Sequence, residues 1–314
     1  MLRVLVVSCA MLAVSQLPCA AAPALLASDT RETTSPSSVS HSNAAAASAS
    51  FEDHAAENEL LEMANKSRGL AGVPPLRMED NLREAARAHA RLMVASELLE
   101  HRFPGEPALL ERIARVTFMH DASNVVSNVT TNNASNIPLK MDRAGENIAN
   151  ATCAMGANDA LMHSEPHRQN LLDPAFTAVG IAAVWSKGRL YVVQDFAHEV
   201  RSYSAHESRE LVGRAIAEAR QQAGLPELRQ LTPPNLDEAA CSLAQESRPN
   251  ARLLATAYKN RRIIAYTQSQ PDVLPPGGAR LLRDPEVREF AVGSCYARNA
   301  AYPTGMYWVA ILLY

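Results

Sequence analysis

The stretch HSEPHRQNLLDP contains His163 and His167, four residues apart, with Glu165 between them. In the zinc-hydrolase motif H-E-x-x-H, both histidines lie on one helical face and the glutamate directly follows the first. Here the glutamate comes one place later, and Pro166 would remove a helical hydrogen bond and clash with the preceding turn. The sequence therefore predicts that Pro166 opens a new short helix, capped by Ser164 or Glu165, and that the two histidines do not form a helical metal pair.

Two further segments carry residues of the same chemical types. LLEHRFPG places His101 just after a predicted helix, and RAGENIAN places Glu146 in a polar loop that leads into an apolar turn. Histidine and carboxylate groups in one cleft could bind a divalent metal or form a proton-transfer pair. The spacing of these residues does not itself show that they converge with His167. All nine histidines lie at or before His206, so any such site belongs to the first part of the chain.

Structural roles compete with these functional ones. His89 lies on an apolar helical stripe, which is typical of a buried core histidine. Arg168 and Asn170 are expected to fix a turn by hydrogen bonds, and Asp195 is expected at a turn or a strand edge. The alternative role for Glu146 is also structural, with its carboxylate accepting backbone N–H groups.

The chain has 314 residues, which is enough for about two domains. An apolar beginning, MLRVLVVSCAMLAVSQLPCAAAPA, predicts a signal peptide over residues 1–22. Residues 23–54 are rich in Ser and Ala and predict a disordered tether. The net charge of −3, without a basic run, argues against nucleic-acid binding, and no other stretch is apolar enough to span a membrane. We expect a secreted or periplasmic protein.

Two stretches of the chain repeat one pattern. ENELLEMANKSRGLAGVPPLRMEDNLREAARAHARLM and SRELVGRAIAEARQQAGLPELRQLTPPNLDEAACSLAQE both predict a helix, a turn and a second helix, and each half closes with apolar strands. A repeat near 150 residues indicates duplication of a whole domain. We therefore expect one domain at 55–200 and a second at 205–314. Helices followed by a late antiparallel sheet define the α+β class.

The first domain resembles the bacterial branch of the CAP superfamily, which includes cysteine-rich secretory proteins, antigen 5 and plant pathogenesis-related proteins. The segments that carry the resemblance are LLEMANKSRGLAGVPPLRMEDNLREAARAHARLM, His101, GENIA, SEPHRQNLLDPAFTAVGIA and YVVQDF, in that order. The resemblance implies an α-β-α sandwich (the SCP domain) with a central cleft that carries two histidines and one or two glutamates. By match these are His101, Glu146 and His167, and Glu165 stands nearest to the place of a second glutamate.

The second domain resembles the same fold in degenerate form, because LPPGGARLLRDP replaces the histidine segment and no GENI motif is present. This fold and the repeat together place Cys241 on a helix that packs against the strand of Cys295. We expect these two cysteines to form a disulfide and Cys153 to be free. The alternative is that Cys241 and Cys295 are two separate buried thiols.

Two functions fit these features. The first is an exported binding or interaction module whose cleft takes a divalent cation such as Zn²⁺ or a small extracellular ligand, a class that leaves open small molecules, lipids and cell-envelope components. The alternative is a metal-dependent, peptidase-like hydrolase that uses the same cleft. No Ser or Cys nucleophile motif is evident. A catalytic zinc usually needs three protein ligands, so Glu146 would have to join the two histidines. The binding module is therefore favoured.

Overall fold

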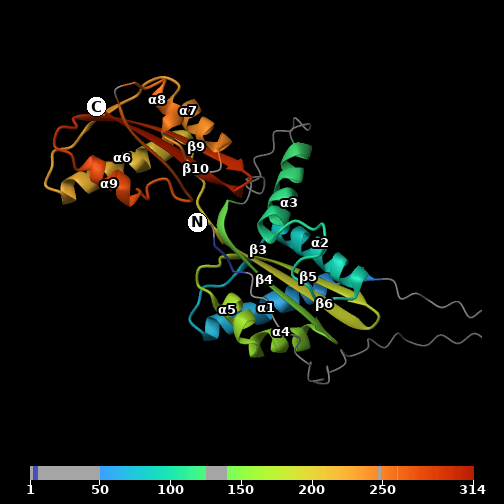
Figure 1. The fold of residues 1–314 in the computed structure, drawn as a ribbon. Helices are drawn as coiled ribbons and strands as arrows, with labels where there is room; N and C mark the ends of the chain where they lie inside the picture. Colours follow the sequence, from blue (N-terminus) through green and yellow to red (C-terminus); the bar gives the residue numbers. More distant parts are fainter. Residues whose placement is uncertain (1–2, 6–49, 125–139, 247–248, 260) are drawn as a thin grey trace, which may run out of the picture.

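The computed structural model describes residues 3–5, 50–124, 140–246, 249–259 and 261–314. Within them the chain forms two units, each built on its own sheet (Figure 1). The helices and strands of the first unit are β2 (Phe51–Glu52), α1 (His54–Leu70), β3 (Arg77–Met78), α2 (Asp80–Ser96), α3 (Leu109–Asn124), β4 (Met141–Ala151), α4 (Ala154–His163), α5 (Glu165–Leu172), β5 (Ala178–Ser186) and β6 (Arg189–Glu199). Helices and a largely antiparallel sheet confirm the α+β class.

The first sheet has the strand order β1-β4-β6-β5-β2, and β3 pairs with β5 in parallel. Its centre is the antiparallel pair of the long strands β4 and β6, in which Glu146 lies opposite Asp195. Apolar side chains on one face pack against α1, α4 and α5, and those on the other face pack against α2 and α3. The result is the helix-sheet-helix layering that the resemblance implies.

Helix α2 approaches the sheet so closely that one strand position admits no side chain. A Cβ atom at Gly180, on β5, would lie 2.0 Å from the carbonyl carbon of Leu82. The buried face of α2 therefore rests directly on β5, with Leu82, Ala85 and Ala86 fully buried. This contact fixes the distance of α2 from the sheet, and with it the position of the loop that follows α2.

Strand β2 begins at Phe51, four residues before the predicted domain boundary of residue 55. Strand β2 pairs with β5, and Asp53 caps α1 by accepting the N–H of Ala56 at 3.0 Å. Trp185 also donates its indole N–H to Asp53 at 2.9 Å. The rest of the predicted tether lies outside the described residues, as does most of the predicted signal peptide. Within that peptide, β1 (Arg3–Leu5) pairs in parallel with β4, and cleavage of the leader stays a prediction.

The second unit contains α6 (Ala205–Gln222), β7 (Arg229–Leu231), α7 (Leu236–Ser242), the 3₁₀ helix η2 (Leu243–Gln245), α8 (Arg252–Ala255), β8 (Arg262–Gln268), α9 (Pro276–Leu282), β9 (Glu289–Asn299) and β10 (Tyr302–Leu313). Its sheet has the order β7-β9-β10-β8. Helices α6 and α9 cover one face, and α7 with η2 and α8 covers the other. A separate core in each unit means that each sheet buries its own apolar faces.

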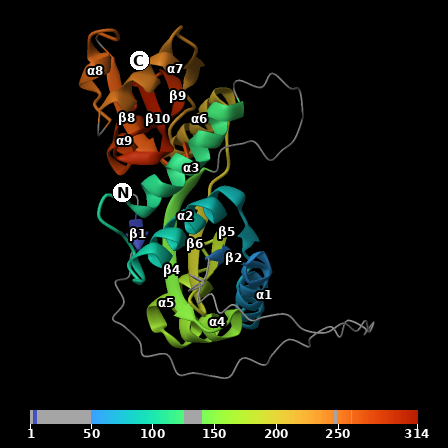
Figure 2. The ribbon, with the colours of Figure 1, turned by 90° about the vertical axis from the view of Figure 1, so that its right-hand side faces the viewer.

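Two elements of the first unit reach the second. Helix α3 contacts β10 (Figure 2), and Thr304 donates its hydroxyl to the carbonyl of Met141 at 3.3 Å. Beside them, the ammonium group of Lys140 lies 3.8 Å from the ring centroid of Tyr296, a cation–π contact. Burial lowers the pKa of Lys140. The start of β4 and the helix α3 are thus held against the second unit.

The cysteines confirm one expectation and correct another. Cys241 and Cys295 form a disulfide between α7 and β9, with their Cα atoms 5.1 Å apart. The expectation that Cys153 is free is wrong, because this residue is also disulfide-bonded and its partner lies outside the described residues. The internal repeat suggested a pairing for Cys241 and Cys295, both in the second unit, and it gave no information on a partner for Cys153. Separately, a search of the described helices finds none with the length and apolar character needed to cross a membrane.

We predict that Gly180→Ala destabilises the protein by about 3 kcal/mol, because the added methyl would overlap the backbone of α2. Gly69→Ala is the matched control: no atom lies within 4 Å of its added Cβ, and alanine is the better helix former. Urea unfolding of the two variants measures the difference. Equal stabilities would show that α2 does not rest on β5 as described.

Candidate functional site

The GENI motif lies on β4, and its alternating side chains serve the two faces of the sheet. Gly145 leaves room for Phe176, whose ring carbon would lie 2.9 Å from an added Cβ. Asn147 faces α5, where its amide donates to the carbonyl of His167 at 3.1 Å. Glu146 and Ile148 face the opposite layer, and Ile148 joins the apolar core beneath α2. The motif therefore places one carboxylate in a fixed direction at the edge of that core.

Both carboxylate oxygens of Glu146 are engaged. Nδ1 of His101 lies 2.8 Å from Oε1, and the guanidinium of Arg112 donates to Oε2. His101 comes from the loop between α2 and α3, and Arg112 comes from the first turns of α3. Glu146 is 2% exposed, so these two partners replace the water that a surface carboxylate would bind.

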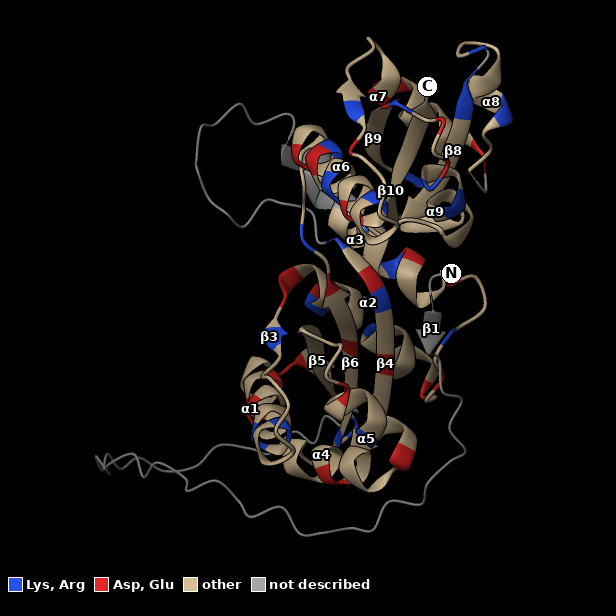
Figure 3. Cartoon of the chain, turned by 90° about the vertical axis from the view of Figure 1, so that its left-hand side faces the viewer, with Lys and Arg blue, Asp and Glu red and all other residues tan. Residues whose placement is uncertain are grey.

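Arg112 is the centre of a buried charge cluster, which we define as Arg112 with Glu106, Glu146 and Asp195. Besides Glu146, its guanidinium contacts Oε1 of Glu106 at 3.1 Å and Oδ1 of Asp195 at 3.4 Å. Burial alone would lower the pKa of Arg112, but the three carboxyl groups outweigh it and raise that pKa. Arg112 is therefore a permanent cation. Figure 3 shows acidic positions on β4 and β6, the strands that carry Glu146 and Asp195.

His89 joins this cluster from α2. Its Nδ1 lies 2.7 Å from Oε1 of Glu106, and its Nε2 lies 3.9 Å from Oε2 of Glu146. The ring is fully buried, as expected of a core histidine, and packs at 5.7 Å from the ring of Phe103. It is a core residue whose polar atoms face two carboxylates.

The two carboxyl groups that face each other across β4 and β6 have pKa values shifted in opposite directions. Burial raises the pKa of Glu146, but the hydrogen bond with His101 and the charge of Arg112 outweigh it and lower the pKa to about 2. For Asp195, burial dominates, and the neighbouring Glu146 adds to it, so its pKa lies well above the ordinary value. Two like charges this close cannot both be stable in a dry site. Glu146 is therefore the more acidic of the two groups, and Asp195 is the one that takes up a proton more readily.

The helix break predicted at Pro166 is confirmed. Helix α4 ends at His163, Ser164 is the N-cap of α5, and Pro166 lies in the first turn. The exposed His163 bonds the carbonyl of Asp159 at 2.8 Å, away from His167. The two histidines therefore do not form a pair on one helix.

His167 is buried at the start of α5, and its Nδ1 lies 2.8 Å from the hydroxyl of Ser164. Burial lowers the pKa of His167, and the nearby charge of His101 lowers it further. Asn170, one turn later, donates its amide to the carbonyl of Glu146 at 3.3 Å. As expected, Asn170 fixes the local structure, and in doing so it ties the helix of His167 to the strand of Glu146.

The Nε2 atoms of His101 and His167 are buried and have no hydrogen-bond partner among the described residues. Each ring is fixed through its other nitrogen, to Glu146 and to Ser164 respectively. Across the described part of the chain, no group of three or more His, Cys, Asp or Glu side chains has an arrangement that could hold a metal ion. The described residues thus leave imidazole nitrogens without partners, at His101, His167 and also His89, rather than a complete ligand set.

The sequence names Glu165 as the nearest candidate for a second cleft glutamate, and that assignment stays a prediction. Glu165 is exposed on α5, where Gln169 donates to it at 3.2 Å. The second buried glutamate is Glu106, which follows His101 in the same loop. Sequence reasoning also missed Arg112, and it expected Asp195 at a turn or edge, whereas Asp195 lies inside a central strand. The one sequence signal for this cluster was Glu106, an acidic residue in the same loop as His101.

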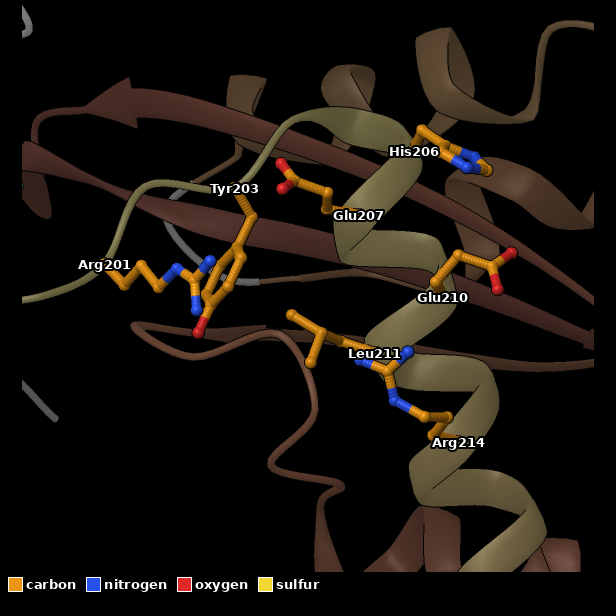
Figure 4. Close-up of a pocket in the computed structure, with 7 residues that line it drawn as sticks. All are labelled: Arg201, Tyr203, His206, Glu207, Glu210, Leu211 and Arg214. Atoms are coloured by element: carbon orange, nitrogen blue, oxygen red, sulfur yellow. The ribbon is translucent and has the colours of Figure 1, made fainter.

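A separate cavity of about 290 Å³ lies beside the N-terminal half of α6 (Figure 4). Arg201, Tyr203 and Arg214 are among its lining residues, and Glu207 is committed to capping α6 through Ser204. Its charged side chains are exposed to solvent. The buried imidazole nitrogens without partners lie in the first unit instead, at His89, His101 and His167.

A family model matches part of the chain. Residues 61–196 match the model of the CAP family, described as the cysteine-rich secretory protein family. The matched range contains His101, Arg112, Glu146 and His167. This region of the chain is therefore similar to the CAP family.

Individual relatives are distant. The uncharacterized protein YkwD of Bacillus subtilis (strain 168) is 26% identical over 167 residues, which cover 52% of this chain and 51% of YkwD. The chain thus spans about half the length of this curated relative. An extracellular protein containing a SCP domain from Bacillus anthracis is 21% identical over 46% of this chain and 41% of its own, with a TM-score of 0.37. An outer surface protein from Borrelia burgdorferi is 12% identical over 48% and 98% of the two chains, with a TM-score of 0.39.

We predict opposite effects for two isosteric substitutions in the cluster. Glu146→Gln should lower stability at pH 7, because it removes an ionised partner of Arg112. That deficit should shrink as the pH falls from about 4.5 toward 2, where wild-type Glu146 loses its own charge. Asp195→Asn should keep or raise stability at pH 7, because the native pKa of Asp195 is raised above that of the unfolded chain, so its ionisation opposes folding. Thermal unfolding from pH 7 down to about 2 tests both, and a loss at pH 7 with Asp195→Asn equal to that of Glu146→Gln would contradict the opposite pKa shifts.

Proposed function

We propose that this protein is an exported CAP-domain binding module whose first-unit cleft binds a divalent cation, such as Zn²⁺, through His101 and His167. The observation that carries the proposal is the pair of buried, unpartnered Nε2 atoms. Export is supported by the signal-like leader and by the disulfide between Cys241 and Cys295, because such bonds persist mainly in oxidising compartments outside the cytoplasm.

The local hydrogen bonds suit imidazole coordination. A carboxylate on Nδ1 holds that nitrogen protonated, which leaves the lone pair on Nε2 for a cation. Glu146 provides this for His101, and the hydroxyl of Ser164 can do the same for His167. Burial also lowers the pKa of His167, which favours the neutral imidazole that metals require.

The donor set fits a cation held by two imidazole nitrogens, with its other positions open. Glu146 does not complete a three-ligand set, because His101 and Arg112 occupy its two oxygens. A bound cation would supply Lewis-acid attraction toward an oxygen or nitrogen atom of an extracellular ligand, whether a small molecule, a lipid head group or a cell-envelope component. A hydrolase is less favoured, because catalytic zinc usually rests on three protein ligands.

We also propose that residues 205–314 are a degenerate copy of the CAP fold. Support comes from two matching contacts. Arg68 donates to the carbonyls of Pro74, Leu171 and Asp173, and Arg220 donates to those of Pro226, Leu282 and Asp284 at similar distances. A Cβ at Gly293 would meet the backbone of Leu236 at 2.1 Å, as Gly180 meets that of Leu82.

Zinc titration by calorimetry tests the proposed site. We predict one equivalent of Zn²⁺ per chain, and a loss of affinity of at least about 100-fold for His101→Gln or His167→Gln, since each removes one of two ligands. His163→Gln is the control, because that histidine is exposed on α4 and points elsewhere. Undiminished binding by the double variant His101→Gln/His167→Gln would place the zinc site elsewhere and reject the proposal.

If the second unit repeats the fold, Arg220 should be as important to it as Arg68 is to the first. Each guanidinium is fully buried and donates hydrogen bonds to several backbone carbonyls. Replacing either arginine with Met should therefore lower the free energy of unfolding by roughly 3 kcal/mol. Denaturant unfolding of Arg68→Met and Arg220→Met measures this. A negligible loss for Arg220→Met alone would argue against equivalent roles.

A further inference from the structure

We propose that a cavity beside α6 in the second unit binds a primary carboxamide group, held by the backbone N–H and C=O of Leu228. The cavity has a volume of about 210 Å³, and its lining includes Ala217, Leu228 and Phe290. It contains none of the histidines and carboxylates of the first-unit site, so this binding site is independent of the proposed cation site. The first unit shows what the chain itself places at the equivalent position.

The turn that follows α1 has the same geometry as the turn that follows α6. Gly72 and Gly224 occupy the left-handed region in these turns, with φ of 70° and 67°. Two residues after each glycine, a backbone carbonyl accepts Nε–H of a buried arginine, at 2.7 Å from Arg68 and at 2.8 Å from Arg220. The two turns can therefore be compared residue by residue.

The same offset in sequence relates Asn65 to Ala217 and Leu76 to Leu228. In the first unit, the side-chain amide of Asn65 donates to the carbonyl of Leu76 at 3.0 Å and accepts its N–H at 2.7 Å. In the second unit Ala217 has no polar side chain, and the main chain of Leu228 makes no hydrogen bond with any other described residue. Because the turns match, the N–H and C=O of Leu228 face Ala217 and the cavity that Ala217 lines.

This backbone pair selects a primary carboxamide by its hydrogen-bonding pattern. It needs an acceptor and a donor side by side, and a primary carboxamide presents an oxygen and an N–H on one edge. A trans secondary amide carries these two groups on opposite sides of its plane. A carboxylate has acceptors alone, so it would place a negative charge against the carbonyl of Leu228. A water molecule needs only roughly 10–15 Å³, so the cavity has room for a larger group.

The rest of the lining suits the part of the ligand that carries the carboxamide. Ile216 and Phe290 are buried and provide an apolar surface. Glu210, Arg214 and Glu227 are exposed at the same cavity, and none of them forms an ion pair with a described residue. Glu210 and Arg214 also line the adjoining cavity at the start of α6 (Figure 4). A short aliphatic stem with polar or charged groups beyond it, as in glutamine, therefore fits the site.

The test titrates the full chain with two probes and follows the NMR signal of the Leu228 backbone amide. One probe is free L-glutamine, and the other is an acetylated tripeptide methylamide with glutamine in the middle. Each is compared with its glutamate counterpart, which should bind at least about 10-fold more weakly because it cannot donate to the carbonyl of Leu228. Binding of the free amino acid alone identifies a small molecule as the source of the carboxamide, and binding of the tripeptide identifies a peptide. The absence of binding of both glutamine probes at about 10 mM, or equal binding of glutamine and glutamate, would overturn the proposal.

Ala217→Asn provides a second test, because it supplies the amide from the chain itself, as Asn65 does. It should weaken glutamine binding at least about 10-fold, since its own amide occupies the backbone of Leu228. Its melting temperature should lie at least about 3 °C above that of Ala219→Asn, a control on α6 outside the cavity with the same loss of helix propensity. Unchanged glutamine binding, or a melting temperature no higher than the control's, would reject the site. Zinc titration should be unaffected by Ala217→Asn, so this outcome does not depend on the proposed cation site.

Discussion

The buried ion pair between Arg112 and Glu146 is the interaction on which the geometry of the site depends. It joins α3 to β4, and neither side chain is more than 5% exposed. Burying such a pair costs desolvation that offsets most of its attraction, so its main effect is to fix position rather than to add stability. With one oxygen of Glu146 held by Arg112, the other is left to orient His101. The direction of the His101 ring therefore depends on the ion pair.

The two proposed ligand histidines approach from opposite layers of the sandwich. His101 follows α2, which lies with α3 on one face of the sheet, whereas His167 lies on α5, on the other face. Asn147 and Asn170 tie α5 to β4, and the electrostatic effect of His101 on His167 shows that the two rings lie near each other. Helix α3 and strand β4 carry the ion pair between Arg112 and Glu146. Both elements also contact the second unit.

Much of the fold and part of the site could be predicted from local sequence. Pro166 forced the helix break whatever the tertiary structure, and the repeat paired Cys241 with Cys295 because equivalent elements occupy equivalent places. Arg112 could not be found in this way, because its segment reads as an amphipathic helix with charges that normally face water. Asp195 required the strand register that sets it opposite Glu146. Buried charges are defined by partners distant in sequence, and spacing along the chain does not reveal them.

The most direct test of this account is a crystal structure of the protein soaked with Zn²⁺. The account predicts one ion bound by Nε2 of His101 and Nε2 of His167, with water or another small ligand at its open positions and with Glu146 still hydrogen-bonded to His101 and Arg112. A structure in which Arg112 has moved away and Glu146 coordinates the ion would contradict the central claim, as would a zinc ion bound outside this cleft alone.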